Sequence, residues 1–535
     1  MGIVNYNQHG IISGFLSSVE KYPDRQALDV ESNVLTYKEL SNIALNITDV
    51  ITKFNSSSDF VSLLAYRSVT AFSGILGILA SGKGYVPLNP GFPIERIYNQ
   101  LELSKSDILI VGRECLDVFV SLLNKIERPL KIILPDRDAL IDNEILKLSQ
   151  QHEIYFLDKI VDINPDNILQ NINLDSSAYL LFTSGSTGIP KGVAVSHSNV
   201  KSFVDYICNN YTLKQTDRFS QTADINFDLS VLEIFPCWEV GGCLCCLPKE
   251  IVMAPARYIR DKELTVWVSV PSVGIFMSKM RLLKPDAFPG LRYCMFCGEA
   301  LLQDTAEKWS LAAPNSVIVN LYGPTEATVA ITQYNWNEES SNKCSNGIVP
   351  IGWTFSSQQT CIVDEKLNVL KGGESGELCL SGTQLTKGYF NNIEKTLSQF
   401  IKIPEYGDKI WYRTGDLVYQ ESDGCMHYLG RIDNQVQVLG YRVELQEIDN
   451  ILRKITGTEL AVSIPWPIEN GVAQGITAFI CGGDIIRKNE IISHCEKVLP
   501  SYMIPREIFF IDNMPVNANG KIDRLELTKI INGEA

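Results

Sequence analysis

The chain contains 535 residues, which is too many for a single hydrophobic core, so its length predicts two or more domains. Hydrophobic residues make up 45% of it and charged residues 20%, a composition typical of a soluble globular enzyme. With 47 Lys and Arg against 62 Asp and Glu, the net charge is −15. This acidic balance argues against nucleic acid and anionic membranes as partners, because clustered basic residues bind both.

The first residues, Met-Gly-Ile-Val-Asn-Tyr, lack the basic and apolar regions of a signal peptide. The apolar run 71–80 is too short to span a bilayer and is expected to form a buried helix. The 14 cysteines follow no regular spacing, which indicates reduced thiols in a cytoplasmic protein. One Cys-x-x-Cys, at Cys294 and Cys297, lacks a second pair at metal-ligand spacing and is more typical of a buried strand than of a zinc or redox centre.

The first 350 residues alternate between helix-like and strand-like patterns. Apolar residues at helical spacing over 36–54 predict a helix, and the run 71–80 predicts another that leads into a strand at 85–88. This alternation predicts an α/β fold with largely parallel sheets.

The pattern changes from about residue 349. Short strands at 360–363, 377–381 and 417–419, separated by Gly, Asp and Asn turns, predict a β-barrel-like subdomain. Beyond it, helical patterns at 445–455 and 489–498 and strands at 459–464 and 475–480 predict a small α+β domain. The predicted division is an N-terminal domain of residues 1–430, a hinge at 431–433 and a C-terminal domain of 434–535.

The strongest chemical signal is the segment from Leu181 to Gly192, Leu-Phe-Thr-Ser-Gly-Ser-Thr-Gly-Ile-Pro-Lys-Gly. An apolar strand leads into glycines that allow an anion to approach, hydroxyls that donate to phosphate oxygens, and a lysine that adds positive charge. It is not the common P-loop, because Pro190 precedes Lys191 and Gly192 follows it. The segment predicts a phosphate-binding loop, and a flexible surface loop is the alternative.

This loop and the motifs that follow it resemble the signatures of the adenylate-forming superfamily, which contains acyl-CoA synthetases, peptide-synthetase adenylation domains and luciferases. The resemblance covers about residues 30–530, and its motifs are specific because they occur in a fixed order. After the loop come Phe227-Asp228-Leu229-Ser230, Asn320-Leu321-Tyr322-Gly323-Pro324-Thr325-Glu326, Gly376-Glu377-Leu378, Tyr412-Arg413-Thr414-Gly415-Asp416, Gly430-Arg431-Ile432-Asp433-Asn434-Gln435-Val436 and Asn519-Gly520-Lys521-Ile522-Asp523-Arg524.

The resemblance implies ATP as a co-substrate. Tyr322 resembles the residue that stacks on adenine, Asp416 the residue that accepts hydrogen bonds from the ribose hydroxyls, and Arg431 a residue that contacts ribose or phosphate. The full set implied to bind ATP is Thr183, Ser184, Gly185, Ser186, Thr187, Gly188, Lys191, Gly298, Glu299, Asn320, Tyr322, Gly323, Thr325, Asp416 and Arg431.

Two further residues are implied to act on the phosphates. Glu326 resembles the carboxylate that holds Mg2+ on the phosphates, and a carboxylate at a helix N-terminus is the alternative. Lys521 resembles the catalytic lysine, a cation that offsets the repulsion between the attacking carboxylate and the α-phosphate. Without its place near the C-terminus, the Asn-Gly-Lys sequence would indicate only an exposed turn.

The resemblance also implies a second half-reaction with a thiol. Asp433 resembles the hinge about which a mobile C-terminal domain turns, and Gly440 lies in a predicted hairpin that resembles the wall of a pantetheine tunnel. The sequence 481–485 carries Ile485 where a carrier domain would carry the serine that bears phosphopantetheine. We therefore expect a separate carrier protein as the partner.

Asp228 indicates the class of acid that is activated. In amino-acid-activating members of the superfamily, an Asp at this position pairs with the substrate ammonium, and without such a cation a buried Asp would be costly. The alternative is an Asp bonded only to backbone. Matched motif to motif, the implied substrate-binding residues are Asp228, Leu229, Leu232, Ser269, Met295, Cys297, Leu321, Val329 and Ala330.

No charged residue faces the expected side-chain pocket, so a small apolar amino acid is predicted. Ser269 and Cys297 resemble the pattern of D-alanine–carrier ligases, whereas Leu232 and Leu321 resemble that of prolyl–carrier ligases. The apolar wall of Leu321 favours L-proline. The predicted activity is therefore ATP-dependent formation of an aminoacyl-AMP and its transfer to a carrier thiol. The alternatives are D-alanine as substrate and a CoA ligase for a small carboxylic acid.

Overall fold

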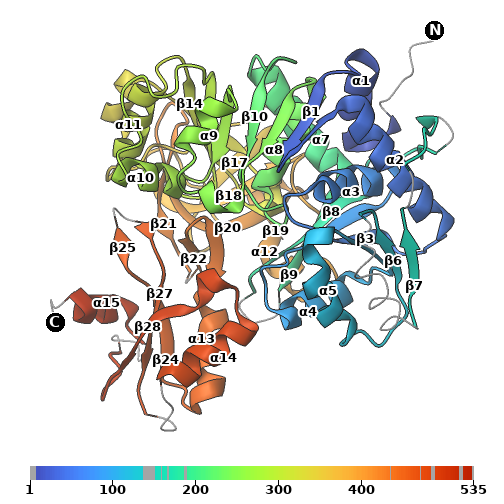
Figure 1. Cartoon of the computed structure of the whole chain (residues 1–535). Coiled ribbons are helices and arrows are strands. Elements are labelled where there is room, and N and C mark those ends of the chain that lie inside the picture. The colour runs from blue at the N-terminus through green and yellow to red at the C-terminus, as the bar shows by residue number, and fades with distance from the viewer. Residues whose placement is uncertain are drawn as a thin grey trace. The chain divides into compact units, whose positions relative to one another are not determined.

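A computed structural model describes residues 8–136, 151–157, 160–165, 168–185, 190–433, 435–469, 472–482, 488–516 and 522–532. Contacts divide the chain into two compact units (Figure 1). Unit 1 contains Met1–Pro90, Tyr98–Leu181 and Gly192–Gly430, and unit 2 contains Gly91–Ile97, Phe182–Lys191 and Arg431–Ala535. Unit 2 therefore includes two short early segments that the sequence-based division assigns to the N-terminal domain.

A seven-stranded sheet in unit 1 has the order β7-β6-β5-β3-β4-β8-β9. The strands from β7 to β8 in this order pair in parallel, as the alternating sequence pattern predicts. The bounds are β3 Phe60–Leu64, β4 Gly84–Leu88, β5 Ile108–Val111, β6 Lys131–Leu134, β7 Glu153–Phe156, β8 Ser177–Thr183 and β9 Lys191–Ser196.

A nine-stranded sheet has the order β16-β15-β14-β13-β12-β10-β11-β1-β2. Its centre, from β14 to β1, is parallel, and antiparallel strands close both edges. The bounds are β1 Gln26–Val30, β2 Asn33–Thr36, β10 Arg218–Gln221, β11 Cys243–Cys246, β12 Val266–Ser269, β13 Tyr293–Phe296, β14 Val317–Tyr322, β15 Thr332–Trp336 and β16 Trp353–Thr354.

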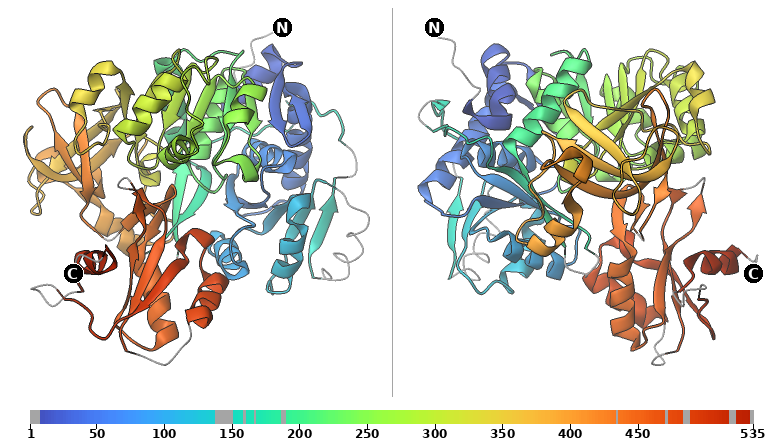
Figure 2. Two further views of the ribbon diagram at one scale, coloured as in Figure 1. Left: turned by 60° about the vertical axis from the view of Figure 1, so that its left-hand side comes forward. Right: turned by 180° about the vertical axis from the view of Figure 1, so that it is seen from behind.

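Helices cover these sheets, and α2 packs against α3 (Figure 1 and Figure 2). Helix α2 begins with a capping box between Thr36 and Glu39, and the side chain of Ser68 caps α3 by accepting from Ala71 N–H. The bounds are α1 Ser13–Lys21, α2 Tyr37–Lys53, α3 Val69–Ala80, α4 Ile94–Ser104, α5 Leu116–Leu123, α7 His197–Asn210, α8 Leu229–Glu239, α9 Ala256–Asp261, α10 Pro271–Lys279, α11 Gln303–Ala312 and α12 Ile393–Gln399.

The predicted β subdomain is a five-stranded sheet in unit 1, in which β17, β18, β20 and β19 pair in sequence and β21 pairs with β20. The bounds are β17 Gln358–Val363, β18 Ser375–Gly382, β19 Phe400–Lys402, β20 Ile410–Gln420 and β21 Met426–Arg431. The three strands that the sequence predicts here lie within β17, β18 and β20.

Unit 2 is a small α+β body with a four-stranded and a three-stranded sheet. Its hairpin, β22–β23, turns through Leu439 and Gly440, which both have positive φ, 50° and 85°, as a two-residue hairpin turn requires. The bounds are β22 Gln435–Val438, β23 Tyr441–Glu444, α13 Leu445–Thr456, β24 Ala461–Pro465, β25 Ile468–Glu469, β26 Val472–Ala473, β27 Ile476–Ile480, α14 Lys488–Val498, β28 Pro505–Phe510 and α15 Arg524–Asn532. The mixed α/β fold expected from the sequence is confirmed.

Candidate functional site

Asp228 stands at the start of α8, at the end of the loop that leaves β10. The side chain is buried, with 7% of the residue exposed. Leu229 and Leu232, the next predicted substrate contacts, lie in the first turns of α8 and are also buried. The sequence motif therefore places a carboxylate at the edge of an apolar helix face.

Four of the remaining predicted pocket residues come from neighbouring parallel strands. Ser269, Met295, Cys297 and Leu321 lie at or just beyond the carboxyl ends of β12, β13 and β14, which is where parallel α/β sheets bind ligands. Val329 and Ala330 lie in the segment between the short helix Thr325–Ala327 and β15. All of them are buried, and all except Ser269 belong to one hydrophobic cluster together with Leu229 and Leu232. These clustered residues are Met295, Cys297, Leu321, Val329 and Ala330.

Ser269 differs from its predicted neighbours. Its hydroxyl accepts a hydrogen bond of 2.9 Å from the indole N–H of Trp267, and that ring belongs to a second hydrophobic cluster. Residues 267 and 269 share a strand face because side chains alternate along a strand. The hydroxyl of Ser269 is thus engaged with this second cluster.

The turn that carries Val329 is unusually tight. Val329 has φ of 68°, and a Cβ on Gly323 would lie 2.6 Å from the Cα of Ala330. Only glycine fits at position 323, so this motif glycine brings two backbone segments together. The thiol of Cys297 donates to the carbonyl oxygen of Val329 at 3.7 Å.

Two buried tyrosines near Asp228 were not singled out by the sequence. Tyr85 on β4 and Tyr179 on β8 are register partners, with ring centroids 5.5 Å apart. Burial, and then the charge of Asp228, raises the pKa of each hydroxyl well above its usual value. Among the described residues the Tyr179 hydroxyl has no hydrogen-bond partner. In the sequence both tyrosines look like ordinary core residues of apolar strands.

The electrostatics around Asp228 are those of a site shielded from water. Burial raises the pKa of the Cys297 thiol, and the negative charge of Asp228 raises it further. Cys297 therefore stays a neutral thiol, and a carboxylate in such surroundings attracts a cation strongly.

The predicted adenine and ribose residues meet in unit 1. The hydroxyl of Tyr322, at the end of β14, donates to Oδ2 of Asp416 on β20 at 2.5 Å. The two residues are 94 positions apart. A carboxylate beside an aromatic ring fits a nucleoside, because the ring can stack on the base while the oxygens accept from ribose hydroxyls.

Other predicted nucleotide residues have structural partners. The side-chain amide of Asn320 donates to the carbonyls of Val349 and Pro350. The carboxylate of Glu299 accepts from the N–H of Ser272 at 2.8 Å, in the first turn of α10. Gly298 has φ of 96°, which favours glycine, and Thr325 lies in the short helix η6, Thr325–Ala327. These predicted nucleotide residues therefore also have structural roles within unit 1.

Glu326, the predicted Mg2+ ligand, is fully buried in η6. Its Oε1 accepts from the hydroxyl of Tyr389 at 2.7 Å. A carboxylate is a suitable donor for a hard cation, so this residue fits the predicted role. Among the described residues, no group of three or more acidic, His or Cys side chains forms a protein-only metal site, so Mg2+ would also need oxygens from the phosphates.

The phosphate-loop residues that the structure describes lie in unit 2. Lys191 forms an ion pair of 2.9 Å with Glu444, and the hydroxyl of Ser184 donates to the carbonyl of Arg442. The hydroxyl of Thr183 is buried without a hydrogen-bond partner among the described residues. Gly185 is described, whereas Ser186, Thr187, Gly188 and the predicted catalytic residue Lys521 lie outside the described residues.

The predicted hinge residue Asp433 holds Arg431. Two hydrogen bonds, of 2.9 and 2.6 Å, join the guanidinium to the carboxylate, and Gln435 N–H donates to the same carboxylate. Hydrogen bonds and the charge of Arg431 lower the pKa of Asp433 although burial acts in the opposite direction. Arg431, predicted to contact the nucleotide, is therefore engaged by its neighbour.

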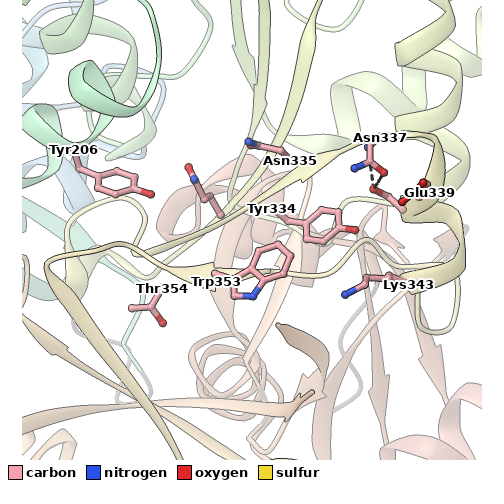
Figure 3. A pocket seen from close by; sticks show the side chains of 10 residues that line it. Tyr206, Tyr334, Asn335, Asn337, Glu339, Lys343, Trp353 and Thr354 are labelled. Atoms are coloured by element: carbon pink, nitrogen blue, oxygen red, sulfur yellow. Dashed lines mark hydrogen bonds between the residues drawn. The ribbon is translucent and has the colours of Figure 1, made fainter. Parts of the chain in front are cut away.

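An open pocket of about 410 Å³ elsewhere in unit 1 contains none of the predicted site residues among its lining (Figure 3). Tyr334 and Trp353 stack there with centroids 5.6 Å apart, and Lys343 lies over Trp353. Lys343 also pairs with Asp423 at 2.9 Å. These side chains stack or pair with one another, and none of the predicted site residues lines the pocket, so we do not take it as the candidate site.

No helix in the described part of the chain is both long and apolar enough to cross a bilayer.

Comparisons with known proteins agree with these motifs. The family model described as AMP-binding enzyme matches residues 15–390. The D-alanine–D-alanyl carrier protein ligase of Bacillus velezensis is 31% identical over 518 residues, covering 94% of this chain and 95% of the relative. Gramicidin S synthase 1 of Brevibacillus brevis is 30% identical and covers 96% of this chain, which matches 44% of that larger protein.

One solved structure is similar over nearly the whole chain. It is the Vibrio cholerae adenylation domain AlmE in complex with glycyl-adenosine-5'-phosphate, with a TM-score of 0.90, 32% identity and 99% of each chain covered.

Proposed function

Because this chain belongs to the family of AMP-binding enzymes, we propose that it activates a small amino acid with ATP and transfers it to a carrier thiol. The first half-reaction forms an aminoacyl-AMP and releases pyrophosphate. The second passes the aminoacyl group to the phosphopantetheine thiol of a separate carrier protein.

The observation that carries the proposal is the burial of Asp228 directly beside residues of the apolar cluster. Asp228 is buried at the start of α8, and Leu229, which follows it, belongs to the same apolar cluster as the predicted pocket residues other than Ser269. A buried carboxylate in such surroundings favours a substrate with an ammonium group. A carboxylic acid without an amine would offer this carboxylate no cation to bind.

The chain's own residues would bind and orient the reactants. Tyr322 and Asp416, already joined by a hydrogen bond, would hold the nucleoside. Glu326 would hold Mg2+, which neutralises charge on the phosphates when it is bound. Lys521, carried over from the sequence motif, would stabilise the charge that develops as the carboxylate attacks phosphorus.

For the side chain of the substrate, we favour D-alanine. The carrier ligase named above has D-alanine in its name, and the predicted pocket positions carry bulky buried residues such as Leu232, Met295 and Leu321, which favour a small substrate side chain over a large one. Glycine is the second candidate, because the AlmE complex contains glycyl-adenosine-5'-phosphate. The sequence-based choice of L-proline gains no support from these relatives.

The test is amino-acid-dependent exchange of pyrophosphate into ATP, measured with glycine, D-alanine, L-alanine, L-proline and propionate. D-alanine should give the fastest exchange. Loading of a phosphopantetheinylated carrier, with CoA as the competing acceptor, then separates a carrier ligase from a CoA ligase. Exchange that depends on propionate but on no amino acid would reject the proposal.

A further inference from the structure

The loop that delivers Asp228 leaves the nine-stranded sheet of unit 1 and is hydrogen-bonded to residues that follow two strands of the seven-stranded sheet. It runs from the end of β10 through residues 222–228 to the start of α8. Its first residues are held by Glu233 on α8, whose carboxyl oxygens accept from the N–H and hydroxyl of Thr222 at 2.6 and 2.8 Å and from Ala223 N–H at 3.2 Å. These bonds fix the departure of the loop from the nine-stranded sheet.

Arg67 reaches the same loop from the seven-stranded sheet. It follows the end of β3 and has φ of 45°, a left-handed conformation that is uncommon for a non-glycine residue. Its guanidinium donates to the carbonyl of Thr222 at 2.5 Å and to Oδ1 of Asp224 at 3.1 Å. The side chains of Arg67 and Asp224 are only 10% and 13% exposed, so water screens this ion pair weakly.

Asn89, which follows β4, provides the second attachment. Its amide donates to Oδ2 of Asp224 at 3.1 Å and to Oδ1 of Asn226 at 3.0 Å. The N–H of Phe227 in turn donates to the carbonyl of Asp224 at 2.9 Å, which closes a turn immediately before Asp228. Asp224 is thus the residue at which both attachments from the seven-stranded sheet meet.

We propose that Arg67, Asn89 and Asp224 are positioning residues that clamp this turn and thereby fix the place of Asp228 relative to the amino-acid ammonium. This inference rests on the proposed function. The clamp ties the carboxyl ends of β3 and β4 to the loop after β10. Its purpose is to keep the buried carboxylate at the distance and angle that ammonium recognition requires.

The test uses the full chain with Asp224→Asn and Asn226→Ala, the second being a milder change that removes only an acceptor for Asn89. Pyrophosphate exchange should show the KM for the amino acid raised about tenfold, equivalent to about 1.4 kcal/mol, with the KM for ATP changed less than about twofold. Hydrogen exchange should be faster in the peptide spanning residues 222–231 and unchanged in residues 26–36.

The matched control is Asp205→Asn, which removes a carboxylate from an exposed ion pair with Lys201 on α7 and should change neither KM. The clamp is rejected if folded variants keep the wild-type KM for the amino acid, if both KM values rise together, or if loop protection is unchanged. Absence of amino-acid-dependent exchange in the wild type would instead reject the proposed function. In that case, loop protection alone decides whether the clamp operates.

Discussion

Replacement of Asp228 by alanine gives the most direct test of how the substrate is recognised. Asp228 is only 7% exposed, and burial, followed by the charge of Asp228, raises the pKa of the Tyr179 hydroxyl and of the Cys297 thiol. The burial of all three side chains indicates surroundings of low polarity around this carboxylate. In Asp228→Ala, the ammonium of a bound amino acid would be buried without the carboxylate that pairs with it.

Breaking such a pair costs about 3–5 kcal/mol, which corresponds to a fall of roughly 10²- to 10⁴-fold in kcat/KM. The kcat/KM of Asp228→Asn for the amino acid should fall by a similar factor, because the amide keeps the shape of the side chain but loses its charge. Activation of propionate, which has no ammonium, should change little in Asp228→Ala or should improve.

The assay is pyrophosphate exchange with D-alanine, glycine and propionate, with circular dichroism as the check on folding. Asp205→Asn, on the exposed face of α7, serves as the control for loss of one surface carboxylate. A folded Asp228→Ala variant that keeps its amino-acid kcat/KM within about tenfold of the wild-type value would refute ammonium recognition by Asp228.

Three further predictions follow from the site and its support. Lys521→Ala should lower aminoacyl-AMP formation by at least about 10²-fold while ATP binding, measured by calorimetry, is retained; near wild-type adenylate formation would exclude Lys521 from the chemistry. Asp433→Pro, which fixes φ, should slow carrier loading more than pyrophosphate exchange, and an equal loss in both steps would argue against a hinge at this residue. Burial raises the pKa of Glu233 to about 8, against 4.5 for the ordinary side chain, so the folded state holds a proton that the unfolded state loses, and stability should fall as pH rises between these two values. Thermal unfolding curves of Glu233→Gln should lack this part of the pH dependence. At low pH the variant should be less stable than the wild type, because its NH2 group would face a backbone N–H that now donates to Glu233.

Much of the fold could be predicted because its signals are local. The helix predicted over 36–54 is α2, Tyr37–Lys53, whose capping box is visible in the sequence as Thr36 and Glu39. The apolar run 71–80 lies within α3 and is buried along almost its whole length. Periodicity and caps depend on neighbouring residues, so a single sequence contains them.

The supporting contacts could not be predicted, because they depend on how distant strands are arranged. Arg67 and Asp224 are 157 positions apart, and Tyr322 and Asp416 are 94 apart. Ser269 lies between these two cases. Strand alternation places it on the same side of β12 as Trp267, and its hydroxyl accepts a hydrogen bond from the Trp267 indole N–H. Because side chains two positions apart in a strand share one face, the sequence alone could have indicated Trp267 as a neighbour of Ser269.

The pocket residues carry a second constraint besides recognition, because they also belong to the core. Leu232, Met295 and Leu321 each have about 1% of their surface exposed and lie in the cluster that joins both large sheets. Truncating such a side chain to enlarge the pocket costs about 2–5 kcal/mol of folding stability, which is a large part of the stability of a typical domain. A larger substrate would therefore require compensating changes elsewhere in the cluster, whereas a smaller one needs none. Asp228 is different, since the loop that precedes it is held in place by the hydrogen bonds of Arg67 and Asn89 to Asp224. Recognition of the ammonium and selection of the side chain are therefore tested by different variants, Asp228→Ala for the first and truncation of a cluster residue such as Leu321 for the second.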